Sequence, residues 1–587
     1  MTLNTDALQG ETPALAKHAE GQAPTVLLSV FDKTGVVELA KSLSKQFSAR
    51  LVATGGTASL LREAGLAVTD VADVTGVGEL LGGRVKTLHP AIFGGLLASD
   101  NTGRTPQAAD LGLPFYVDIA VINLYPFEAT LQQQTKAGEL DAAELVEKID
   151  IGGVALLRAA AKNHAHVFVL SQPCQYEPFI TGLSENRVLT DTPQALAYRR
   201  TLAKQAFEQT AYYDALIAAT FETLEKHDAL EAAESPEQTA QTAQAEPVLP
   251  EALPEILTLP LKQIQPMRYG ENPHQDAALY SAYGTKPSFS VLQGKALSYN
   301  NLLDLYSAWH LINEFDFAEP ACAIIKHNNP CGVAIDSGSQ PSIKQAFMRA
   351  LACDPVSAFG GIIACNQPVD ADAAQAMTQL FLEVIAAPGY TPEALALFES
   401  KKNLRVVTLP LTHTPAKTAP LMLRQLNAGL FLAQRTNPGK GANFNNVDSA
   451  SQNIFQQWQQ QLTTPTQAKP TPEQLQDLFF AWQVAKHLKS NAMVLTKNGQ
   501  TVGLGGGQTS RIGALEIALR QACDQSIGAV LASDGFLPAV DNIEAAAQAK
   551  ISAIAQPGGS IKDAEVIALA DKLGVAMVMT GIREFKH

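Results

Sequence analysis

The sequence has little of what marks secreted or membrane-spanning proteins. Only six of its 587 residues are cysteine, and no two of them form a Cys-x-x-Cys pair. Scattered cysteines favour reduced thiols over a disulfide framework. No apolar run approaches the roughly 20 residues of a membrane span. The first residues also lack the basic flank and apolar core of a secretory signal. A cytoplasmic protein with no membrane partner is therefore expected.

Positive charge is scarce as well. The chain has 43 Lys and Arg residues against 57 Asp and Glu residues, for a formal net charge of −14. Such a balance argues against a large non-specific nucleic-acid surface, so nucleic acid is not expected as a partner. Small anions remain possible ligands, because local basic clusters and backbone N–H groups bind them even in acidic proteins.

Several catalytic motifs are missing. The chain has no P-loop, no Gly-x-Gly-x-x-Gly after a strand and no Gly-x-Ser-x-Gly, so ATP, dinucleotides and serine-hydrolase chemistry are not indicated. The eleven histidines include no His-Glu-x-x-His. A zinc deaminase would need His-x-Glu and Pro-Cys-x-x-Cys, and Pro330-Cys331 has no second cysteine three residues on. No metal is therefore expected.

Two α/β regions are present instead. From about Thr25, apolar runs such as TVLLSVF and ARLVATGG alternate with helical patterns such as VVELAKSLSKQF, which predicts a mostly parallel sheet covered by helices. Pro, Glu, Gln and Ala dominate residues 223–257 and predict a linker. A second α/β region follows, with a hairpin predicted at AMVLTKNGQTVGLG. The polar tract at 435–476 offers little to a core and is interpreted as a surface excursion.

Polar residues gather at strand ends in the first region. The segments are SVFDKTG from Ser29, TGGT from Thr54 and GGRVKTLHP from Gly82. Glycines and a helix start let backbone N–H groups converge, which suits a phosphate. A glycine pair is more often a simple turn, and an exposed basic loop is the plain interpretation of GGRVKTLHP.

A lysine and a histidine follow a buried strand in the second region, in IKHNNPCG at 325–332. Adjacent strand residues point to opposite faces, so Lys326 or His327 is expected to face the less exposed side. A snorkelling lysine and a capping histidine are the structural alternative. RYGENPH, DPVSAFGG, KSNA, GGGQTSR and SDGF are further polar segments at strand ends, where open α/β sheets bind ligands.

Taken in order, these motifs resemble the AICAR formyltransferase/IMP cyclohydrolase family. The resemblance runs from SVFDKTG, GGRVKTLHPAIFGGLL, NLYPF and EKIDIGGVALLRAAAKNH to SYNNLLD, IKHNNPCG, CDPVSAFGG, GGGQTSRI and REFKH. It implies a bifunctional enzyme of purine biosynthesis with no required metal. The enzyme would transfer a formyl group from 10-formyltetrahydrofolate to 5-aminoimidazole-4-carboxamide ribonucleotide (AICAR). It would then close the product to IMP with loss of water.

The resemblance also implies a domain organisation. Residues 1–23 would form a disordered tail, 24–222 a methylglyoxal-synthase-like cyclohydrolase domain, 223–257 a linker and 258–587 the formyltransferase domain. The last would be a duplicated cytidine-deaminase-like α/β fold without zinc, in a cytoplasmic homodimer. A regulatory nucleotide-binding module and a zinc nucleoside deaminase stay open as alternatives.

Site residues follow from the same resemblance. His327 would assist removal of the amine proton, Lys326 would stabilise charge or protonate the departing folate nitrogen, and Asn491 would bind the formyl oxygen as it becomes an oxyanion. The implied catalytic residues of ring closure are Lys86, Tyr125, Asp150 and Lys162. The implied binding residues of ring closure are Ser29, Lys33, Gly56, Thr57, Arg84 and Thr87. Those of formyl transfer are Arg268, Tyr269, Asn301, Phe359, Gly360, Arg511, Phe536, Pro538, Asp541, Arg583 and His587.

Overall fold

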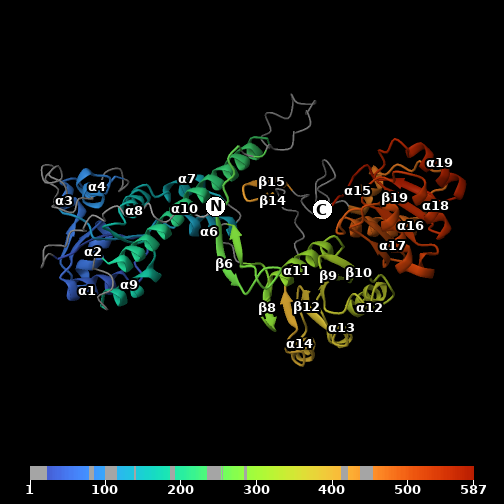
Figure 1. The fold of residues 1–587 in the computed structure, drawn as a ribbon, viewed down its shortest axis with the longest axis horizontal. Helices are drawn as coiled ribbons and strands as arrows, with labels where there is room; N and C mark the ends of the chain where they lie inside the picture. The colour runs from blue at the N-terminus through green and yellow to red at the C-terminus, as the bar shows by residue number, and fades with distance from the viewer. Residues whose placement is uncertain are drawn as a thin grey trace, which may run out of the picture. The chain divides into compact units, whose positions relative to one another are not determined.

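The structure is a computed structural model that describes residues 23–78, 85–98, 115–137, 140–184, 192–233, 253, 255–282, 287–410, 421–435 and 454–587 (Figure 1). The chain divides into two compact units. Unit 1 comprises Met1–Ile264 and Tyr280–Thr285, and unit 2 comprises Gln265–Leu279 and Lys286–His587. The tail predicted at 1–23 and most of the linker predicted at 223–257 lie outside the described residues. No helix in the described part of the chain is long and apolar enough to cross a membrane.

Unit 1 is built on a five-stranded parallel sheet in the order β3-β2-β1-β4-β5, as the sequence predicts for this region. The order reverses between β1 and β4, so the carboxyl ends of the strands there form a crevice suited to ligands. The strands are β1 (Thr25–Ser29), β2 (Arg50–Ala53), β3 (Val68–Asp70), β4 (Ile119–Ile122) and β5 (Phe168–Leu170).

Helices accompany this sheet, and most of them contribute to a common core with it, whereas Phe127 and Leu145 of two others pack with Tyr213 and Leu216 in a smaller cluster. The helices are α1 (Val36–Phe47), α2 (Gly55–Glu63), α3 (Val71–Thr75), α4 (Pro90–Leu97), α6 (Phe127–Ala137), α7 (Ala142–Glu147), α8 (Gly152–Lys162), α9 (Tyr176–Ser184) and α10 (Pro193–Ala233). The first eleven residues of the predicted linker therefore belong to the end of a long helix. Two strands, β6 (Leu261–Met267) and β7 (Ala277–Ala282), then pair with each other.

Unit 2 contains the same sheet twice. The order is β10-β9-β11-β12-β13 in the first half, with β8 added at the edge, and β17-β16-β18-β19-β20 in the second. In each half the first two pairings are antiparallel and the next two are parallel. This repeat is the duplicated α/β fold expected from the sequence. Figure 1 shows α11 to α14 around the first sheet and α15 to α19 around the second.

The elements of the first half are β8 (Ser290–Gln293), α11 (Tyr299–Ile312), β9 (Ala321–Lys326), β10 (Asn329–Ile335), α12 (Ile343–Cys353), β11 (Gly361–Cys365), α13 (Ala371–Met377), β12 (Leu382–Ala387), α14 (Pro392–Glu399) and β13 (Arg405–Thr408). A hairpin of β14 (Leu421–Asn427) and β15 (Leu430–Arg435) follows. The second half has α15 (Ile454–Gln461), α16 (Pro472–Ala485), β16 (Met493–Thr496), β17 (Thr501–Gly505), α17 (Arg511–Ala522), β18 (Val530–Ser533), α18 (Asp541–Gln548), β19 (Ala553–Gln556), α19 (Asp563–Leu573) and β20 (Ala576–Met579).

Helix starts in unit 2 follow directly from the sequence. Six helices begin after a Ser, Thr or Asp whose side chain accepts a hydrogen bond from the backbone N–H three residues on, which satisfies a group that the helix leaves free. These residues are Ser298, Ser342, Asp370, Thr391, Thr471 and Ser510. The hairpin predicted at KNG is also confirmed, since Asn498 and Gly499 have φ of 55° and 69° between β16 and β17.

The two halves meet along β10 and β17. Val333 N–H donates to Thr501 Oγ1 at 2.9 Å, and Ile335 N–H donates to the Gly499 carbonyl at 2.9 Å. A helix lies very close to β10, because a Cβ added at Gly332 would lie 1.9 Å from the Ala350 carbonyl oxygen. Glycine is therefore required at this strand position.

The surface excursion predicted at 435–476 is wrong over its last part. Helix α15 lies within it, and Trp458 is only 1% exposed. The ring of Trp458 lies 5.2 Å from that of Phe479 and 6.1 Å from that of Trp482. Its glutamine-rich surroundings, QNIFQQWQQQ, concealed one apolar helix face formed by Ile454, Phe455 and Trp458.

Candidate active sites

The carboxyl ends of β1 and β2 hold the first polar group in unit 1. Lys33 Nζ donates to Thr57 Oγ1 at 2.9 Å and also to the Val30 carbonyl. Thr54 Oγ1, which precedes α2, donates to Ser29 Oγ at 3.4 Å. The predicted residues Ser29, Lys33 and Thr57 are thus brought together. Space in front of Gly56 is open, because a Cβ added there would meet nothing within 4 Å.

Asn123, immediately after β4, holds the loop that carries Lys33. Its Oδ1 accepts the N–H groups of Phe31 at 2.5 Å and Asp32 at 2.9 Å, and its Nδ2 donates to the Asp32 carbonyl at 2.9 Å. Asn123 was not among the predicted site residues. The sequence signal for it was its place in NLYPF, at the end of a buried strand.

Asp150 and Lys86 form a second group beside the first. Asp150 Oδ1 accepts the Gly153 N–H at 2.6 Å, and Oδ2 accepts the Tyr125 N–H at 3.3 Å. Burial raises the pKa of the Asp150 carboxyl, although these hydrogen bonds and the charge of Lys86 oppose the shift. Burial also lowers the pKa of Lys33, and the charge of Lys86 lowers it further. Lys33, Lys86 and Asp150 therefore share one electrostatic environment.

Thr87 and two aromatic rings complete this group. A Cβ added at Gly152 would lie 2.9 Å from Thr87 Oγ1, so Thr87 packs against the start of α8. The rings of Phe31 and Tyr125 meet edge to face at 5.6 Å, and both are exposed. Cationic, acidic and aromatic groups thus line one end of the sheet, an arrangement suited to a flat anionic ligand.

Lys162 and Arg84 are not brought into this group by the described part of unit 1. Lys162 is the last residue of α8, which begins at Gly152 beside Asp150. Ten helical steps separate the two ends by about 15 Å along the helix axis. Arg84 lies outside the described residues.

The Lys326–His327 pair in unit 2 occupies a tight hairpin. Lys326 ends β9 as expected, but His327 is not on a strand, so the expectation of opposite-facing strand neighbours is wrong. His327 and Asn328 have φ of 53° and 61°, and β10 begins at the next residue. A type I′ hairpin turn requires positive φ at both central residues, where Asn-Gly is the usual pair. Histidine in this conformation is uncommon and often marks a functional position.

Asp304 on α11 fixes this turn. Its Oδ2 accepts the His327 N–H at 3.3 Å, and its Oδ1 accepts the Asn328 N–H at 2.7 Å. One carboxylate thereby satisfies both turn amides. Asp304 was missed from the sequence, because only the packing of α11 beside the end of β9 reveals its role.

Lys326 also contacts an exposed aromatic surface. Its Nζ donates to the Phe359 carbonyl at 2.8 Å. The Phe359 ring is 57% exposed and lies 5.2 Å from that of Phe381, which is 49% exposed. Gly360, with φ of 74°, donates its N–H to the Phe381 carbonyl at 2.7 Å. The predicted residues Lys326, Phe359 and Gly360 are therefore neighbours.

A cleft of about 710 Å³ opens beside the pair. This volume lies in the usual range of small-molecule sites. Both halves of unit 2 contribute side chains to it. The lining residues are Lys326, His327, Asn329, Pro330, Cys331, Asp354, Ser357, Leu504, Ile517, Arg520 and Gln521.

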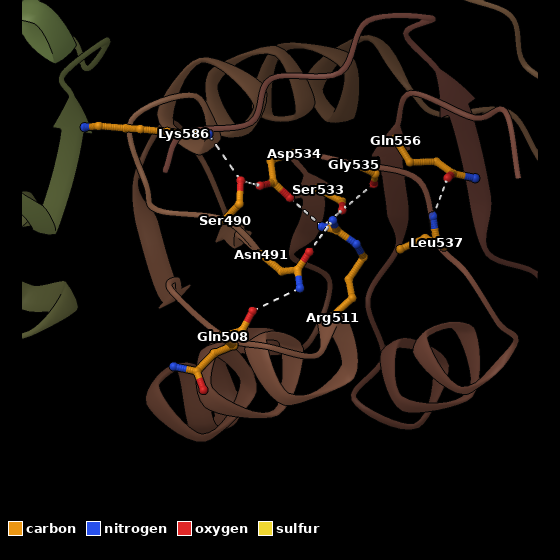
Figure 2. Close-up of polar contacts among 10 residues, drawn as sticks. All are labelled: Ser490, Asn491, Gln508, Arg511, Ser533, Asp534, Gly535, Leu537, Gln556 and Lys586. Atoms are coloured by element: carbon orange, nitrogen blue, oxygen red, sulfur yellow. Dashed lines mark hydrogen bonds and ion pairs between the residues drawn. The ribbon is translucent and has the colours of Figure 1, made fainter. Parts of the chain in front are cut away.

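Asn491 belongs to a different polar cluster, shown in Figure 2. Arg511 Nη2 donates to Asn491 Oδ1 at 2.7 Å, and Asn491 Nδ2 donates to the Gln508 carbonyl at 2.9 Å. Arg511 Nη1 donates to Ser533 Oγ at 2.8 Å and forms an ion pair with the buried Asp534. The Asn491 amide is therefore held with its oxygen occupied. One of its two N–H groups has no partner among the described residues.

The end of the chain packs onto this cluster. Lys586 N–H donates to Ser490 Oγ at 3.2 Å, and Ser490 Oγ in turn donates to Asp534 (Figure 2). A Cβ added at Gly535 would lie 2.6 Å from both Arg511 Nη2 and Phe585 Cε1. Arg583 lies over the Phe585 ring at 4.5 Å, and the Phe585 and His587 rings are 5.8 Å apart. The predicted residues Arg511, Arg583 and His587 thus gather near Asn491.

The other predicted residues have separate positions. Arg268 is exposed and lies over the Tyr269 ring at 5.6 Å. Asn301 Oδ1 accepts the Ser298 N–H at 3.1 Å in the capping box of α11, so this oxygen stabilises the start of the helix. Phe536 and Pro538 are exposed after β18, and Asp541 is exposed at the start of α18.

The Asn491 cluster and the Lys326–His327 cleft lie at opposite ends of helix α17. Arg511 at its start joins the Asn491 cluster, and Arg520 near its end lines the Lys326–His327 cleft. Nine helical steps correspond to about 14 Å. Within the described ranges, no group of three or more His, Cys, Asp or Glu residues that could hold an ion is formed.

Comparison with known proteins gives long and consistent matches. The family model of the AICARFT/IMPCHase bienzyme matches residues 160–521, and that of the MGS-like domain matches residues 35–155. The bifunctional purine biosynthesis protein PurH of Trichodesmium erythraeum is 44% identical over 565 residues, covering 96% of this chain and 99% of its own. PurH of a Cyanothece species is 46% identical over 569 residues, covering 96% and 100%. A crystal structure of ForH is 37% identical, covers 34% of this chain and 97% of its own, and has a TM-score of 0.29.

Proposed function

The chain belongs to the AICARFT/IMPCHase bienzyme family, and from that premise we propose how its residues perform the two reactions. It is a bifunctional enzyme of purine biosynthesis, an AICAR formyltransferase and IMP cyclohydrolase. The co-substrate of the transfer is 10-formyltetrahydrofolate. The first reaction takes place in unit 2, and the second takes place in unit 1.

Formyl transfer proceeds beside the Lys326–His327 turn. The 5-amine of the ribotide attacks the formyl carbon, and His327 accepts the amine proton in that step. Imidazole suits this role, because it exchanges a proton near neutral pH. Lys326 stabilises the developing charge and supplies a proton to the folate nitrogen as its bond to the formyl carbon breaks. The main observation that supports this proposal is that both residues line one cleft, which is large enough for these substrates.

Asn491 stabilises the oxygen of the tetrahedral intermediate. Arg511 occupies the Asn491 oxygen and the Gln508 carbonyl accepts one amide N–H, so the remaining N–H is presented as a donor in a fixed direction. A preorganised donor of this kind binds charge that develops only in the transition state. Arg511 and Asp534 act through Asn491, which they position.

We place the complete transfer site in a homodimer. Within one chain the length of α17, about 14 Å, separates the Asn491 cluster from the Lys326–His327 cleft. The β14–β15 hairpin supports an interface between copies, because Leu426, Leu430, Phe431 and Leu432 are each more than half exposed on it. Contiguous apolar surface of this kind marks association sites.

Ring closure takes place at the carboxyl end of the unit 1 sheet. The carboxamide nitrogen attacks the formyl carbon, and water then leaves. Lys33 and Lys86 attract the anionic ribotide, the Phe31 and Tyr125 rings contact its base, and Asp150 exchanges a proton. Positioning supplies most of the acceleration, so no residue is assigned as sole base. The roles of Lys162 and Arg84 rest on the family resemblance alone.

The cytoplasm is the compartment we assign. All six cysteines are free thiols, as expected for a reducing environment.

The test is an absorbance assay with AICAR and 10-formyltetrahydrofolate, in which IMP should form and tetrahydrofolate should be released. Formylated AICAR alone should also give IMP without folate. A folded, dimeric preparation that forms no IMP from either starting mixture would contradict the proposed function.

A further inference from the structure

Arg520 lies on the cleft of the Lys326–His327 pair but has no role in the reactions described above. It is carried by the last turn of α17, in the second half of unit 2, and lines the same cleft as the hairpin of the first half. Its side chain is exposed, and its guanidinium has no hydrogen bond or ion pair among the described residues. Five N–H donors therefore face the cleft region without a protein acceptor.

The position of Arg520 is fixed by its neighbour. Gln521 Oε1 accepts the Leu504 N–H at 2.7 Å, and Gln521 Nε2 donates to the Cys353 carbonyl at 3.3 Å. One side chain thus ties the end of α17 to β17 and to the end of α12. The backbone of Arg520 is thereby anchored beside the cleft that the Lys326–His327 turn also lines.

The charges on the cleft favour an anion. Lys326, His327 and Arg520 supply its basic groups, and Asp354 is the acidic residue on its lining. Asp354 Oδ1 accepts the Ser357 N–H at 2.9 Å, and the single negative charge of this carboxylate is outnumbered by the positive charges of Lys326 and Arg520 on the same lining. A guanidinium binds planar carboxylates and phosphates through two parallel hydrogen bonds.

We propose that Arg520 binds an oxyanion of a formyltransferase substrate that occupies this cleft. Two groups have this chemistry: a glutamate carboxylate of the folate and the phosphate of the ribotide. The exposed Phe359–Phe381 rings near Lys326 offer a surface for a flat heterocycle, and Arg520 on the cleft lining offers the anion site. The assignment rests on the proposed formyl transfer and adds to it a determinant of substrate affinity.

The test compares Arg520→Met with Arg520→Lys in the full-length enzyme. Initial rates are measured against AICAR and against 10-formyltetrahydrofolate carrying one or several γ-linked glutamates. Arg520→Met should raise the KM of one substrate about tenfold and leave kcat within about twofold, because a charge-assisted contact made equally in ground and transition states is lost. Arg520→Lys should recover part of the loss, since lysine keeps the charge but not the two-pronged geometry.

The substrate whose KM rises is the one that carries the bound oxyanion. A rise for folate, with a smaller advantage of the polyglutamate, assigns a carboxylate, and a rise for AICAR alone assigns the phosphate. Lys572→Met, which removes an exposed positive charge from α19 outside the cleft, is the matched control and should change neither KM.

Unchanged KM values for both substrates in Arg520→Met would overturn the proposal, as would an equal rise in Lys572→Met. The wild-type protein separates this failure from that of the proposed function. If the wild type transfers the formyl group normally and Arg520→Met is unaffected, only the role proposed for Arg520 is wrong. If a folded wild-type enzyme transfers no formyl group, both the role of Arg520 and the proposed formyl transfer are wrong.

Discussion

At the scale of single residues, the hairpin turn explains how a lysine and a histidine can line one cleft side by side. Lys326 is still on the strand, whereas His327 is on the turn in the left-handed region, so the usual alternation of strand side chains does not apply. The sequence placed both residues at a strand end but did not predict the hairpin. His-Asn is an unusual turn pair, and Pro330 at the start of β10 argues against a strand.

The Asp304 carboxylate offers a test of this turn. We expect Asp304→Ala to lower formyl-transfer turnover about tenfold, because the exposed His327 N–H and the partly buried Asn328 N–H lose their acceptor, and leaving a buried N–H unpaired costs about 1–3 kcal/mol. Asp304→Asn keeps one acceptor oxygen and should retain more activity. Turnover at saturating substrates is the measurement, and ring closure by the same protein is the control. Wild-type transfer by Asp304→Ala would show that the turn does not depend on this carboxylate.

At the scale of elements, long-range contacts set the positions of the candidate site loops, which sequence patterns locate only along the chain. The strand ends that precede Lys33 and Lys326 could be found from motifs, because polar residues follow apolar runs there. Among the described residues, Lys86 lies in the loop before α4 and follows no named strand directly, so the strand end predicted at GGRVKTLHP is not observed. The contribution of α10 to the surroundings of Asp150 could not be predicted from the sequence. Tyr213 on this helix donates its hydroxyl to the Lys148 carbonyl at 3.0 Å and accepts the Asp150 N–H at 2.8 Å. Burial raises the pKa of Tyr213 to about 12, so the hydroxyl keeps its proton.

Removing this hydroxyl should affect ring closure selectively. Tyr213→Phe keeps the ring that packs against Phe127 at 6.0 Å but leaves the Asp150 N–H without its acceptor. We expect kcat of ring closure to fall roughly tenfold, the scale of one lost buried hydrogen bond. The pH profile should shift as well, since the surroundings of the Asp150 carboxyl change. Unaltered kcat and pH profile would contradict a positioning role, and formyl transfer should stay normal.

Trp458 marks the limit of composition-based prediction for elements. A tract rich in Gln, Asn and Thr was interpreted as surface, yet three apolar residues at helical spacing bury one of its faces. The helix caps of unit 2 are local by contrast, because Ser, Thr and Asp act there through bonds to residues only three positions away.

At the scale of the whole molecule, a largely buried charge cluster joins the two halves of unit 2. Glu314, just after α11, lies 2.8 Å from Lys486 Nζ and 3.2 Å from His487 Nε2, both just after α16. Burial alone would raise the pKa of Glu314, but the charge of Lys486 and the hydrogen bond from His487 lower it to about 2. A carboxyl with a depressed pKa stabilises the fold above its unfolded pKa near 4.5, and this contribution disappears as the pH falls towards 2.

Glu314→Gln should therefore destabilise unit 2 at neutral pH by about 3 kcal/mol, because Lys486 loses its buried partner. The difference from wild type should narrow between pH 4.5 and pH 2, as the wild-type carboxyl takes up its proton. Denaturant unfolding across this range measures it. A difference that is constant with pH would show that the charge of Glu314 does not stabilise the fold.

The most direct test of the two-unit assignment is to measure both reactions in His327→Ala. We expect formyl-transfer turnover at saturating AICAR and folate to fall by at least ~10², the scale of a lost proton-transfer group. AICAR affinity, measured by calorimetry, should weaken much less. Ring closure of formylated AICAR should proceed at the wild-type rate, because its residues belong to unit 1. Transfer turnover within about threefold of wild type, or an equal loss of both activities in a folded protein, would contradict the assignment.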